Sequence, residues 1–354
     1  MSAERADRLA GLMAEEGLDS ILVTHLLNVR YLSGFTGTNG ACVITAEERL
    51  FITDFRYVEQ AQDQVRGFSP VRGERDLLAD LAGRARGRAG FDDAHMSVRA
   101  HAAIAEKLAE GVELVPAGGL VERLRRVKEP AELAAVRAAA ELADEALNAV
   151  LRGGLAGRTE LAVARALEQE MRERGAEDPS FPAIVAAGAH GALPHATPRD
   201  VEIAAGELVV VDWGAKLDGY CSDCTRTFAS GELEDEAADT YELVRQAQHA
   251  ARDAVRGGAG LADVDGVARE LIDAAGHGER FGHPLGHGVG LEVHEEPRVG
   301  PRSEGALEAG NVVTVEPGVY LPGRFGVRIE DLVAVTDEGC DVLSGLGRDL
   351  TVVG

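Results

Sequence analysis

Lysine is almost absent from the sequence. Only Lys107, Lys128 and Lys216 occur among its 354 residues, so nearly all of the positive charge is carried by arginine. Aspartate and glutamate outnumber lysine and arginine by 60 to 36, which gives a net charge of −24 at pH 7. Nucleic acids and anionic membranes are polyanions that attract basic surfaces. The charge balance therefore argues against either as a partner.

Cysteine is also scarce, and long apolar runs are lacking. Four cysteines are too few for a disulfide framework in a chain of this length. Cys221 and Cys224 form a C-x-x-C pair, but no second pair or nearby histidine completes a zinc site, so we interpret them as small strand residues. The first ten residues lack the apolar core of a signal peptide, and no segment reaches membrane-spanning length. We expect a cytoplasmic protein without a membrane partner.

Length and segment order predict two domains, because 354 residues are many for one hydrophobic core. Up to about Val115, helical and strand-like segments alternate, which predicts a small α/β domain with a mixed or parallel sheet. Its first helix and strands are predicted at residues 5–16, 20–24, 41–45 and 50–53. Residues 28–40 are rich in turn formers and are predicted as a loop. Later helices are expected from Pro130 to 151, from Thr159 as N-cap to 174, and within 236–256 and 262–275.

Two acids flank a predicted β-hairpin. The apolar run 207–215 contains Asp212, the pair Asp218-Gly219 is a strong turn signal, and residues 220–228 return with Asp223. Side chains alternate between the two faces of a strand. Asp212 and Asp223 are equidistant from the junction between Leu217 and Asp218, so any two-residue loop here places both carboxylates on one face. A loop of odd length would separate them.

Glu316 and Glu330 flank a second predicted hairpin in the same way. Strand signals at 311–316 and 327–335 enclose the turn residues Pro322 and Gly323. The two glutamates are symmetric about Gly323, so a loop of three or five residues puts them opposite each other. Pro317-Gly318 interrupts the first strand and is expected to form a bulge there.

Four carboxylates that face one another cannot all ionise without compensation, because like charges raise each other's pKa. Two divalent cations would neutralise them, and one bridging hydroxide would complete the shell. The alternative is four unrelated acids at strand ends, either solvated or in salt bridges. Two symmetric hairpins beside a histidine-rich segment favour the metal centre.

Histidine and glycine concentrate in residues 281–297, which contain His283, His287 and His294. Glycine lets the backbone approach a ligand or another strand closely. His287 and His294 are seven residues apart, so a straight strand would put them on opposite faces, and a shared site requires a bend or bulge. His195, in a loop rich in glycine and alanine, is a further candidate. We interpret the others outside that loop as ordinary surface or core histidines: His25, His95, His101, His249 and His277.

In their order along the chain, these motifs resemble the five-ligand signature of the pita-bread metallopeptidases, which include methionine aminopeptidase, prolidase and Xaa-Pro aminopeptidase. The likeness runs from about Lys128 to the C-terminus. Residues 28–40 and the F-I-T-D-F-R-Y of 51–57 are similar to the N-terminal domain of the proline-specific members and creatinase. The resemblance implies an α+β protein. A pita-bread domain at 123–354 would follow a smaller, ribonuclease-H-like α/β domain, the creatinase N-terminal type, at 1–122. The matching residues are Asp212 and Asp223 in D-x10-D, His287 in G-H-G, Glu316 in V-E-P-G and Glu330 in R-I-E-D.

The resemblance also implies roles for these residues. The five would bind two divalent metal ions, with manganese expected first and cobalt, zinc or iron as alternatives, and Asp223 and Glu330 would bridge the ions. Water activated by both ions would attack the peptide, and Glu316 would accept and shuttle the proton. Residues around the metals would assist. His294 would polarise the scissile carbonyl or stabilise its oxyanion, His195 would contact the peptide nitrogen, His283 would line the pocket, and Arg328 would orient the site through an acid partner or lie solvated on its strand.

These roles predict a Xaa-Pro aminopeptidase, acting on peptides with proline in second position. Prolidase, which splits Xaa-Pro dipeptides with the same metals, is the alternative, and the motifs do not separate the two. Creatinase-type hydrolysis needs no metal and normally accompanies lost ligands, whereas all five are present here. A non-catalytic peptide-binding pita-bread protein usually has a degraded ligand set as well. The resemblance further suggests a homodimer.

Overall fold

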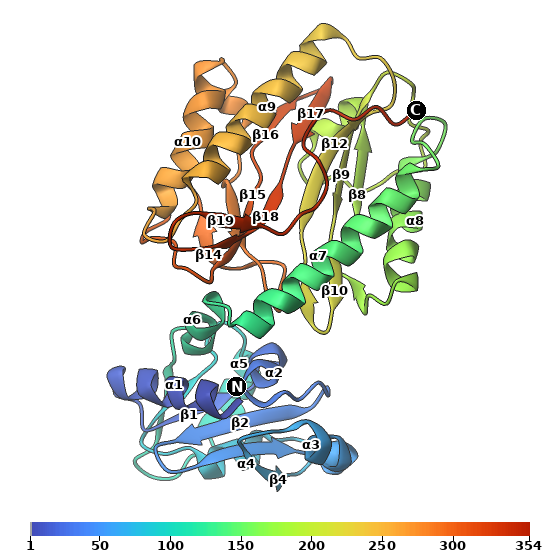
Figure 1. The fold of residues 1–354 in the computed structure, drawn as a ribbon. Coiled ribbons are helices and arrows are strands. Elements are labelled where there is room, and N and C mark those ends of the chain that lie inside the picture. The colour runs from blue at the N-terminus through green and yellow to red at the C-terminus, as the bar shows by residue number, and fades with distance from the viewer. Residues whose placement is uncertain (1) are drawn as a thin grey trace. The chain divides into compact units, whose positions relative to one another are not determined.

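The computed structural model describes residues 2–354 and divides the chain into two compact units (Figure 1). The first unit ends at Arg125, and the second comprises Arg126–Gly354. Helices and strands occur in both units, so the predicted α+β class is confirmed. Among residues 2–354, no helix is both long enough and apolar enough to cross a bilayer.

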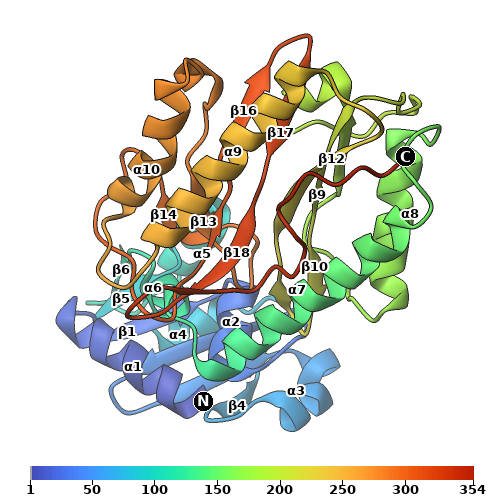
Figure 2. The same ribbon diagram turned by 45° about the horizontal axis from the view of Figure 1, so that its top comes forward.

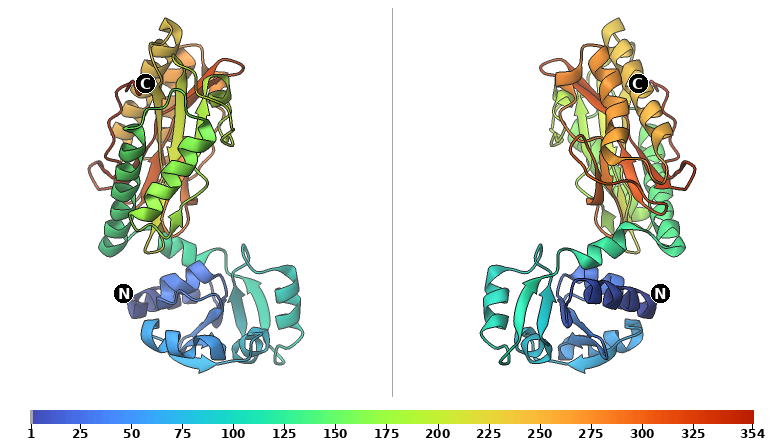
Figure 3. Two further views of the ribbon diagram at one scale, coloured as in Figure 1. Left: turned by 90° about the vertical axis from the view of Figure 1, so that its right-hand side faces the viewer. Right: turned by 90° about the vertical axis from the view of Figure 1, so that its left-hand side faces the viewer.

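The first unit is built on a mixed six-stranded sheet with the order β4-β3-β2-β1-β5-β6. Strand β2 runs antiparallel to β1 and β3, whereas β3/β4, β1/β5 and β5/β6 are parallel pairs. Figure 3 shows helices on both faces of this sheet. The strands are β1 Ser20–Val23, β2 Gly40–Thr45, β3 Arg49–Thr53, β4 Ser69–Arg72, β5 Arg88–Phe91 and β6 Glu113–Pro116. The helices are α1 Ser2–Glu15, α2 Leu26–Ser33, α3 Val58–Gln64, α4 Leu78–Arg84, α5 Val98–Ala105 and α6 Leu120–Arg126.

The loop predicted at residues 28–40 is wrong in its first half, because helix α2 extends to Ser33. Val29 and Leu32 are fully buried, so packing against the sheet stabilises a helix whose polar residues alone would suggest a loop. The helix ends at Gly34, which adopts a left-handed conformation with φ of 84° and donates its N–H to Arg30 O. The remainder of the segment forms the predicted connection to β2.

The second unit has two groups of strands, each covered by a pair of helices. Strands β8, β9 and β12 form one sheet, and β14, β13, β15, β18 and β19 form another in that order. Figures 1 and 2 show α7 and α8 beside the first group and α9 and α10 beside the second. The helices are α7 Pro130–Leu151, α8 Glu160–Glu173, α9 Asp235–Ala254 and α10 Leu261–Ala274. The first group and its neighbours are β7 Asp178–Pro179, β8 Ile184–Ala187, β9 Leu208–Trp213, β10 Ala215–Leu217, β11 Tyr220–Cys221 and β12 Cys224–Ala229. The second group and its hairpin are β13 Gly286–Gly288, β14 Glu295–Val299, β15 Val312–Val315, β16 Gly318–Leu321, β17 Phe325–Arg328, β18 Asp331–Val335 and β19 Cys340–Val342.

Each helix pair closes a separate apolar core. Val244 and Ile272, from α9 and α10, pack with Val313 and Val333 of the second strand group. Leu147 and Leu167, from α7 and α8, pack with Val211 of β9 and other residues of the first group. The predicted helix starts are confirmed, since Pro130 occupies the first turn of α7 and the Thr159 side chain accepts the Ala162 N–H at α8. The two cores hold the strand groups on which the acids are carried.

Candidate metal centre

The hairpin that carries Asp212 and Asp223 turns through two residues, as predicted. Leu217 pairs with Tyr220 across Asp218 and Gly219, and both turn residues have positive φ, 48° and 81°. That conformation is favoured by Asp-Gly in two-residue hairpins. The same register continues into β9 and β12, where Asp212 pairs with Thr225. Asp223 lies two residues before Thr225, so it lies diagonally across from Asp212 on the same face.

The second hairpin turns through Pro322, Gly323 and Arg324, because Leu321 pairs with Phe325. This three-residue loop is one of the two lengths that place Glu316 opposite Glu330. Val315 pairs with Asp331 on the far side of the gap, so the register is unchanged across it. Both glutamates lie in that gap between paired segments, where the strands separate after Glu316. Glu330 N donates instead to Thr225 O, 3.0 Å away, which joins the second hairpin to β12 of the first.

This junction brings all five candidate ligands together. One carboxylate oxygen each from Asp212, Asp223 and Glu330 lies within 4.8 Å of the others, and all three residues are buried. His287 Nε2 lies 3.6 Å from Asp223 Oδ2 and 3.3 Å from Glu316 Oε1. Four oxygen ligands and one imidazole nitrogen thus meet in one buried site. Such a set suits divalent ions of intermediate hardness.

The pKa shifts of the acids show that ionisation of all four carboxylates is unfavourable unless positive charge is added. Burial raises the pKa of Asp223 well above its usual value, and the charges of Glu330, Asp212 and Glu316 raise it further. Burial and the charges of Glu316 and Asp212 do the same to the pKa of Glu330. Glu316 differs: burial would raise its pKa, but the hydrogen bond and charge of His287 outweigh burial and lower it. The acids therefore cannot all be ionised together without a compensating cation.

Two oxygens give a direct test of whether a metal fits. Asp212 Oδ1 and Glu330 Oε1 are buried, and neither has a hydrogen-bond partner among residues 2–354. A buried carboxylate oxygen without a partner costs free energy, and native proteins rarely leave one unsatisfied. The other oxygen of each carboxylate accepts a hydrogen bond: Asp212 Oδ2 accepts from Arg328, and Glu330 Oε2 accepts from Thr225. Divalent cations at the shared site would supply the partners that these two oxygens lack, so the residues fit divalent cations.

Arg328 contacts the acid partner that its position suggested. Its Nη2 donates to Asp212 Oδ2 at 2.6 Å, and its Nε donates to Thr225 Oγ1 at 3.0 Å. Nη1 donates to Tyr320 Oη and to Pro194 O. The guanidinium is 4% exposed, so the solvated alternative is wrong. Arg328 thereby ties Asp212 to the loop that carries His195.

Three further polar residues were missed by the sequence reasoning: Thr225, Thr314 and Tyr320. Thr225 lies opposite Asp212, and its Oγ1 donates to Glu330 Oε2 at 2.7 Å. Thr314 Oγ1 donates to Glu316 Oε1 and accepts the His287 N–H. Both threonines lie two residues from a ligand on the same strand, so alternation along the strand was a signal that could have found them.

The remaining histidines line the same region. His287 and His294 lie on the two sides of a turn instead of along one strand, and their ring centroids are 4.3 Å apart. The register between β13 and β14 shifts between the pairs Gly286–Val299 and Gly288–Glu295, so the pairing of these strands is irregular beside His287. His283 Nε2 lies 3.0 Å from Tyr320 Oη. His195 is exposed on its loop.

A buried cluster of four acids and one imidazole, flanked by further histidines in an α+β fold, is typical of metal-dependent peptide hydrolases. Comparison with known proteins defines the class. Residues 134–337 match metallopeptidase family M24, and residues 5–127 match the Creatinase/Prolidase N-terminal domain. The chain belongs to the M24 metallopeptidase family. The expected combination of a creatinase N-terminal domain with a pita-bread domain is confirmed.

Similar proteins align over almost their whole length. The solved structure of "Xaa-Pro dipeptidase from Bacillus anthracis" has a TM-score of 0.97 and is 39% identical, with 99% of this chain and 100% of that chain covered. The X-Pro aminopeptidase structure from Thermotoga maritima has a TM-score of 0.89 and is 35% identical, covering 98% and 99%. A Xaa-Pro dipeptidase of Pyrococcus furiosus is 34% identical over 98% of this chain and 99% of its own length.

Proposed function

We propose that this protein is a two-metal Xaa-Pro dipeptidase, a prolidase. The observation that carries the proposal is the convergence of Asp212, Asp223, His287 and Glu330 with Glu316 in a buried site with two unpartnered carboxylate oxygens. Relatives that bear the name Xaa-Pro dipeptidase, from Bacillus anthracis and Pyrococcus furiosus, support this substrate class. They favour the dipeptidase over the aminopeptidase that was expected first.

The five residues Asp212, Asp223, His287, Glu316 and Glu330 would hold two divalent cations, with manganese as the first expectation. When bound, the cations neutralise the carboxylates and supply the Lewis acidity that makes water a nucleophile at neutral pH. Asp223 and Glu330, which the resemblance assigns as shared ligands, would be relieved by nearby positive charge, because burial and neighbouring acids raise the pKa of each well above the usual value. Arg328 holds Asp212 by one oxygen and leaves Oδ1 for a cation.

Glu316 is the proposed proton acceptor and shuttle. Its pKa is lowered, because the hydrogen bond and charge of His287 outweigh the effect of burial, so the carboxylate is ionised and able to take a proton. Thr314 Oγ1 donates to Glu316 Oε1 at 3.0 Å and fixes the orientation of the carboxylate. The Glu316 carboxyl group can then deliver the proton to the leaving nitrogen.

The histidines around the acids are the proposed substrate contacts. Burial and the charge of His287 lower the pKa of His294, so its imidazole is neutral near pH 7. A neutral imidazole still has one N–H, which can donate to the scissile carbonyl oxygen as charge develops there. His195, exposed on its loop, would contact the peptide nitrogen. His283, held by Tyr320, would line the pocket for the proline ring.

Substrate length separates the two candidate functions. We expect kcat/KM for Ala-Pro to exceed that for Ala-Pro-Ala by about tenfold or more, because a site that binds the free carboxylate of a dipeptide discriminates against a chain that continues. Ala-Ala serves as the control and should be cleaved poorly. The measurement is release of alanine from each peptide by the metal-loaded enzyme. Preference for Ala-Pro-Ala would overturn the dipeptidase assignment, and cleavage of neither proline peptide would overturn the peptidase proposal.

A Xaa-Pro aminopeptidase is the second candidate function. The likeness to the X-Pro aminopeptidase structure from Thermotoga maritima favours it. The same metals, proton shuttle and carbonyl donor would serve either substrate, so only the part of the site that receives residues after proline would differ. A homodimer remains a prediction for either candidate.

A further inference from the structure

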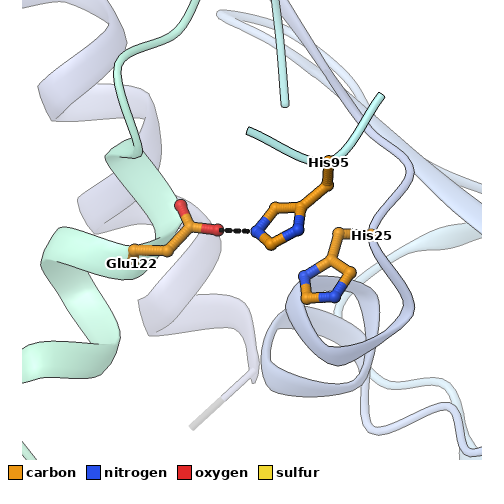
Figure 4. Close-up of side chains that lie close together, drawn as sticks. All are labelled: His25, His95 and Glu122. Atoms are coloured by element: carbon orange, nitrogen blue, oxygen red, sulfur yellow. Dashed lines mark ion pairs between the residues drawn. The ribbon is translucent and has the colours of Figure 1, made fainter. Parts of the chain in front are cut away.

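A second group of potential metal ligands lies within the first unit, formed by His25, His95 and Glu122 (Figure 4). The two imidazole rings are stacked, with centroids 3.7 Å apart and an angle of 7° between their planes. His95 Nε2 lies 3.3 Å from Glu122 Oε1. Donor atoms from all three residues lie within 4.8 Å of one another. From the sequence, both histidines were interpreted as ordinary, because the segments that bring them together are far apart in the chain.

The three side chains are carried by segments that are already tied together. His25 precedes α2, and its backbone N–H donates to Asp92 Oδ2 at 2.8 Å. The Asp92 carbonyl accepts the His95 N–H at 3.0 Å, so the same residue holds both histidine segments. Asp92, His95 and Glu122 also line one hollow of the first unit. The ligands are therefore positioned by backbone contacts and do not depend on each other for their placement.

The Glu122 oxygen that lies against His95 is also held by Asn28. Asn28 Nδ2 donates to Glu122 Oε1 at 2.6 Å, and Asn28 Oδ1 accepts from Arg125 Nη1 at 2.8 Å. Asn28 is completely buried, which limits the positions that the Glu122 carboxylate can adopt. A carboxylate oriented by outer residues in this way is characteristic of metal sites, where such residues fix the ligand geometry.

We propose that His25, His95 and Glu122 form a binding site for a zinc-class divalent cation. Two imidazole nitrogens and one carboxylate oxygen are a ligand set that zinc binds in proteins, with a fourth position left for water. Hard cations such as magnesium prefer all-oxygen sites, so this site and the acid-rich centre of the second unit differ in chemistry. The proposal does not depend on the peptidase function.

The separations between the donor atoms approach those of a ligated state, whereas the orientation of the two stacked rings does not. Donors of a tetrahedral zinc site with bonds of about 2.0 Å lie roughly 3.3 Å apart. The His95–Glu122 separation of 3.3 Å already equals this value. The largest donor separation is at most 4.8 Å, so the remaining donors need to approach by no more than about 1.5 Å. Because an imidazole nitrogen binds zinc in the plane of its ring, at least one of the two stacked rings must also rotate out of the stack for both to bind one ion.

Bound zinc would join the segment before α2, the turn after β5 and helix α6. A ligand that binds the folded state and not the unfolded state raises the free energy of unfolding by RT ln(1 + [ligand]/Kd). The alternative is that the three residues have a structural role without a cation, through the stacked histidine pair and the contact between His95 and Glu122. The two alternatives differ in the number of zinc ions that the chain binds.

Zinc stoichiometry of the full chain tests the proposal. Protein stripped with a chelator would be dialysed to equilibrium against zinc and assayed by elemental mass spectrometry. Glu122→Gln is expected to bind about one zinc ion per chain fewer than the unmodified protein, because the amide is a poor ligand for zinc. His95→Asn should lose the same ion. Magnesium in large excess should not displace it.

Matched variants exclude a general effect of charge or histidine content. Glu106→Gln makes the same change at an exposed glutamate of the first unit, and His249→Asn removes an exposed histidine of the second unit. Both should bind as much zinc as the unmodified chain. If Glu122→Gln also binds as much zinc as the unmodified chain, the proposal is wrong. If His95→Asn does not fold, Glu122→Gln alone decides the outcome, because glutamine can keep the hydrogen bond from Asn28.

Discussion

Asp223→Asn is expected to abolish peptidase activity and to lower the metal content of the protein. Asp223 is buried between Asp212, Glu330 and His287, and it is the proposed bridge between two cations. An asparagine offers one neutral oxygen, so it can neither bridge nor neutralise. Substitution of a residue that only supports a metal ligand typically lowers metal affinity or activity about 10- to 100-fold. Because Asp223 is itself a proposed ligand, we expect a larger loss here. The measurements are kcat on a Xaa-Pro dipeptide and the metal content after dialysis.

Asp218→Asn is the matched control for this variant. Asp218 lies on the same hairpin, is exposed, and occupies a turn position with φ of 48° that asparagine adopts readily. The substitution Asp218→Asn removes the same charge as Asp223→Asn but lies outside the metal centre. The rate of hydrolysis and the metal content should therefore stay unchanged. Full turnover by Asp223→Asn, with both metals retained, would refute the proposed bridge.

His294→Ala is expected to slow catalysis while leaving both metals in place. The His294 ring packs edge-on against the ring of His287, and His294 is not one of the five residues proposed to hold the metals. As the proposed donor to the developing oxyanion, it should contribute to kcat by about 100- to 1,000-fold, the usual effect of one such donor. The measurements are kcat and KM for a Xaa-Pro dipeptide, together with metal content.

His294→Gln distinguishes hydrogen bonding from packing. A glutamine amide can donate to the same carbonyl oxygen, so this variant should recover part of the rate that His294→Ala loses. Recovery would support the donor role, because a purely structural residue would not respond to the restored N–H. Loss of metal from His294→Ala would instead show that His294 is a ligand and that its assignment is wrong.

The placement of the acids within each hairpin was predictable from the sequence. Asp218-Gly219 fixes a two-residue loop, and strand side chains alternate with a period of two, so Asp212 and Asp223 had to share a face. Similar reasoning allowed a loop of three or five residues around Gly323, and the structure has the three-residue loop at 322–324, which places Glu316 opposite Glu330. These are local relations, which depend on a few residues and on strand geometry alone.

Other features depend on tertiary packing that no local pattern encodes. Helix α2 forms because Val29 and Leu32 are buried against the sheet, although its sequence resembles a loop. The bond from Glu330 N to Thr225 O joins the two hairpins, and nothing in either hairpin specifies the other as its partner. Likewise, His25 and His95 became neighbours only when β1 paired with β5, since the histidines lie just beyond those strands.

Titration of the metal-free protein with manganese tests the central claim most directly. The protein would be stripped with a chelator, and the rate of Xaa-Pro dipeptide hydrolysis would be measured as manganese is restored. The account predicts no hydrolysis without metal, because the four acids then hold protons or repel one another and no group activates water. It also predicts that the rate rises with added manganese until both positions are filled. Full activity in a preparation shown by elemental analysis to contain no metal would contradict it.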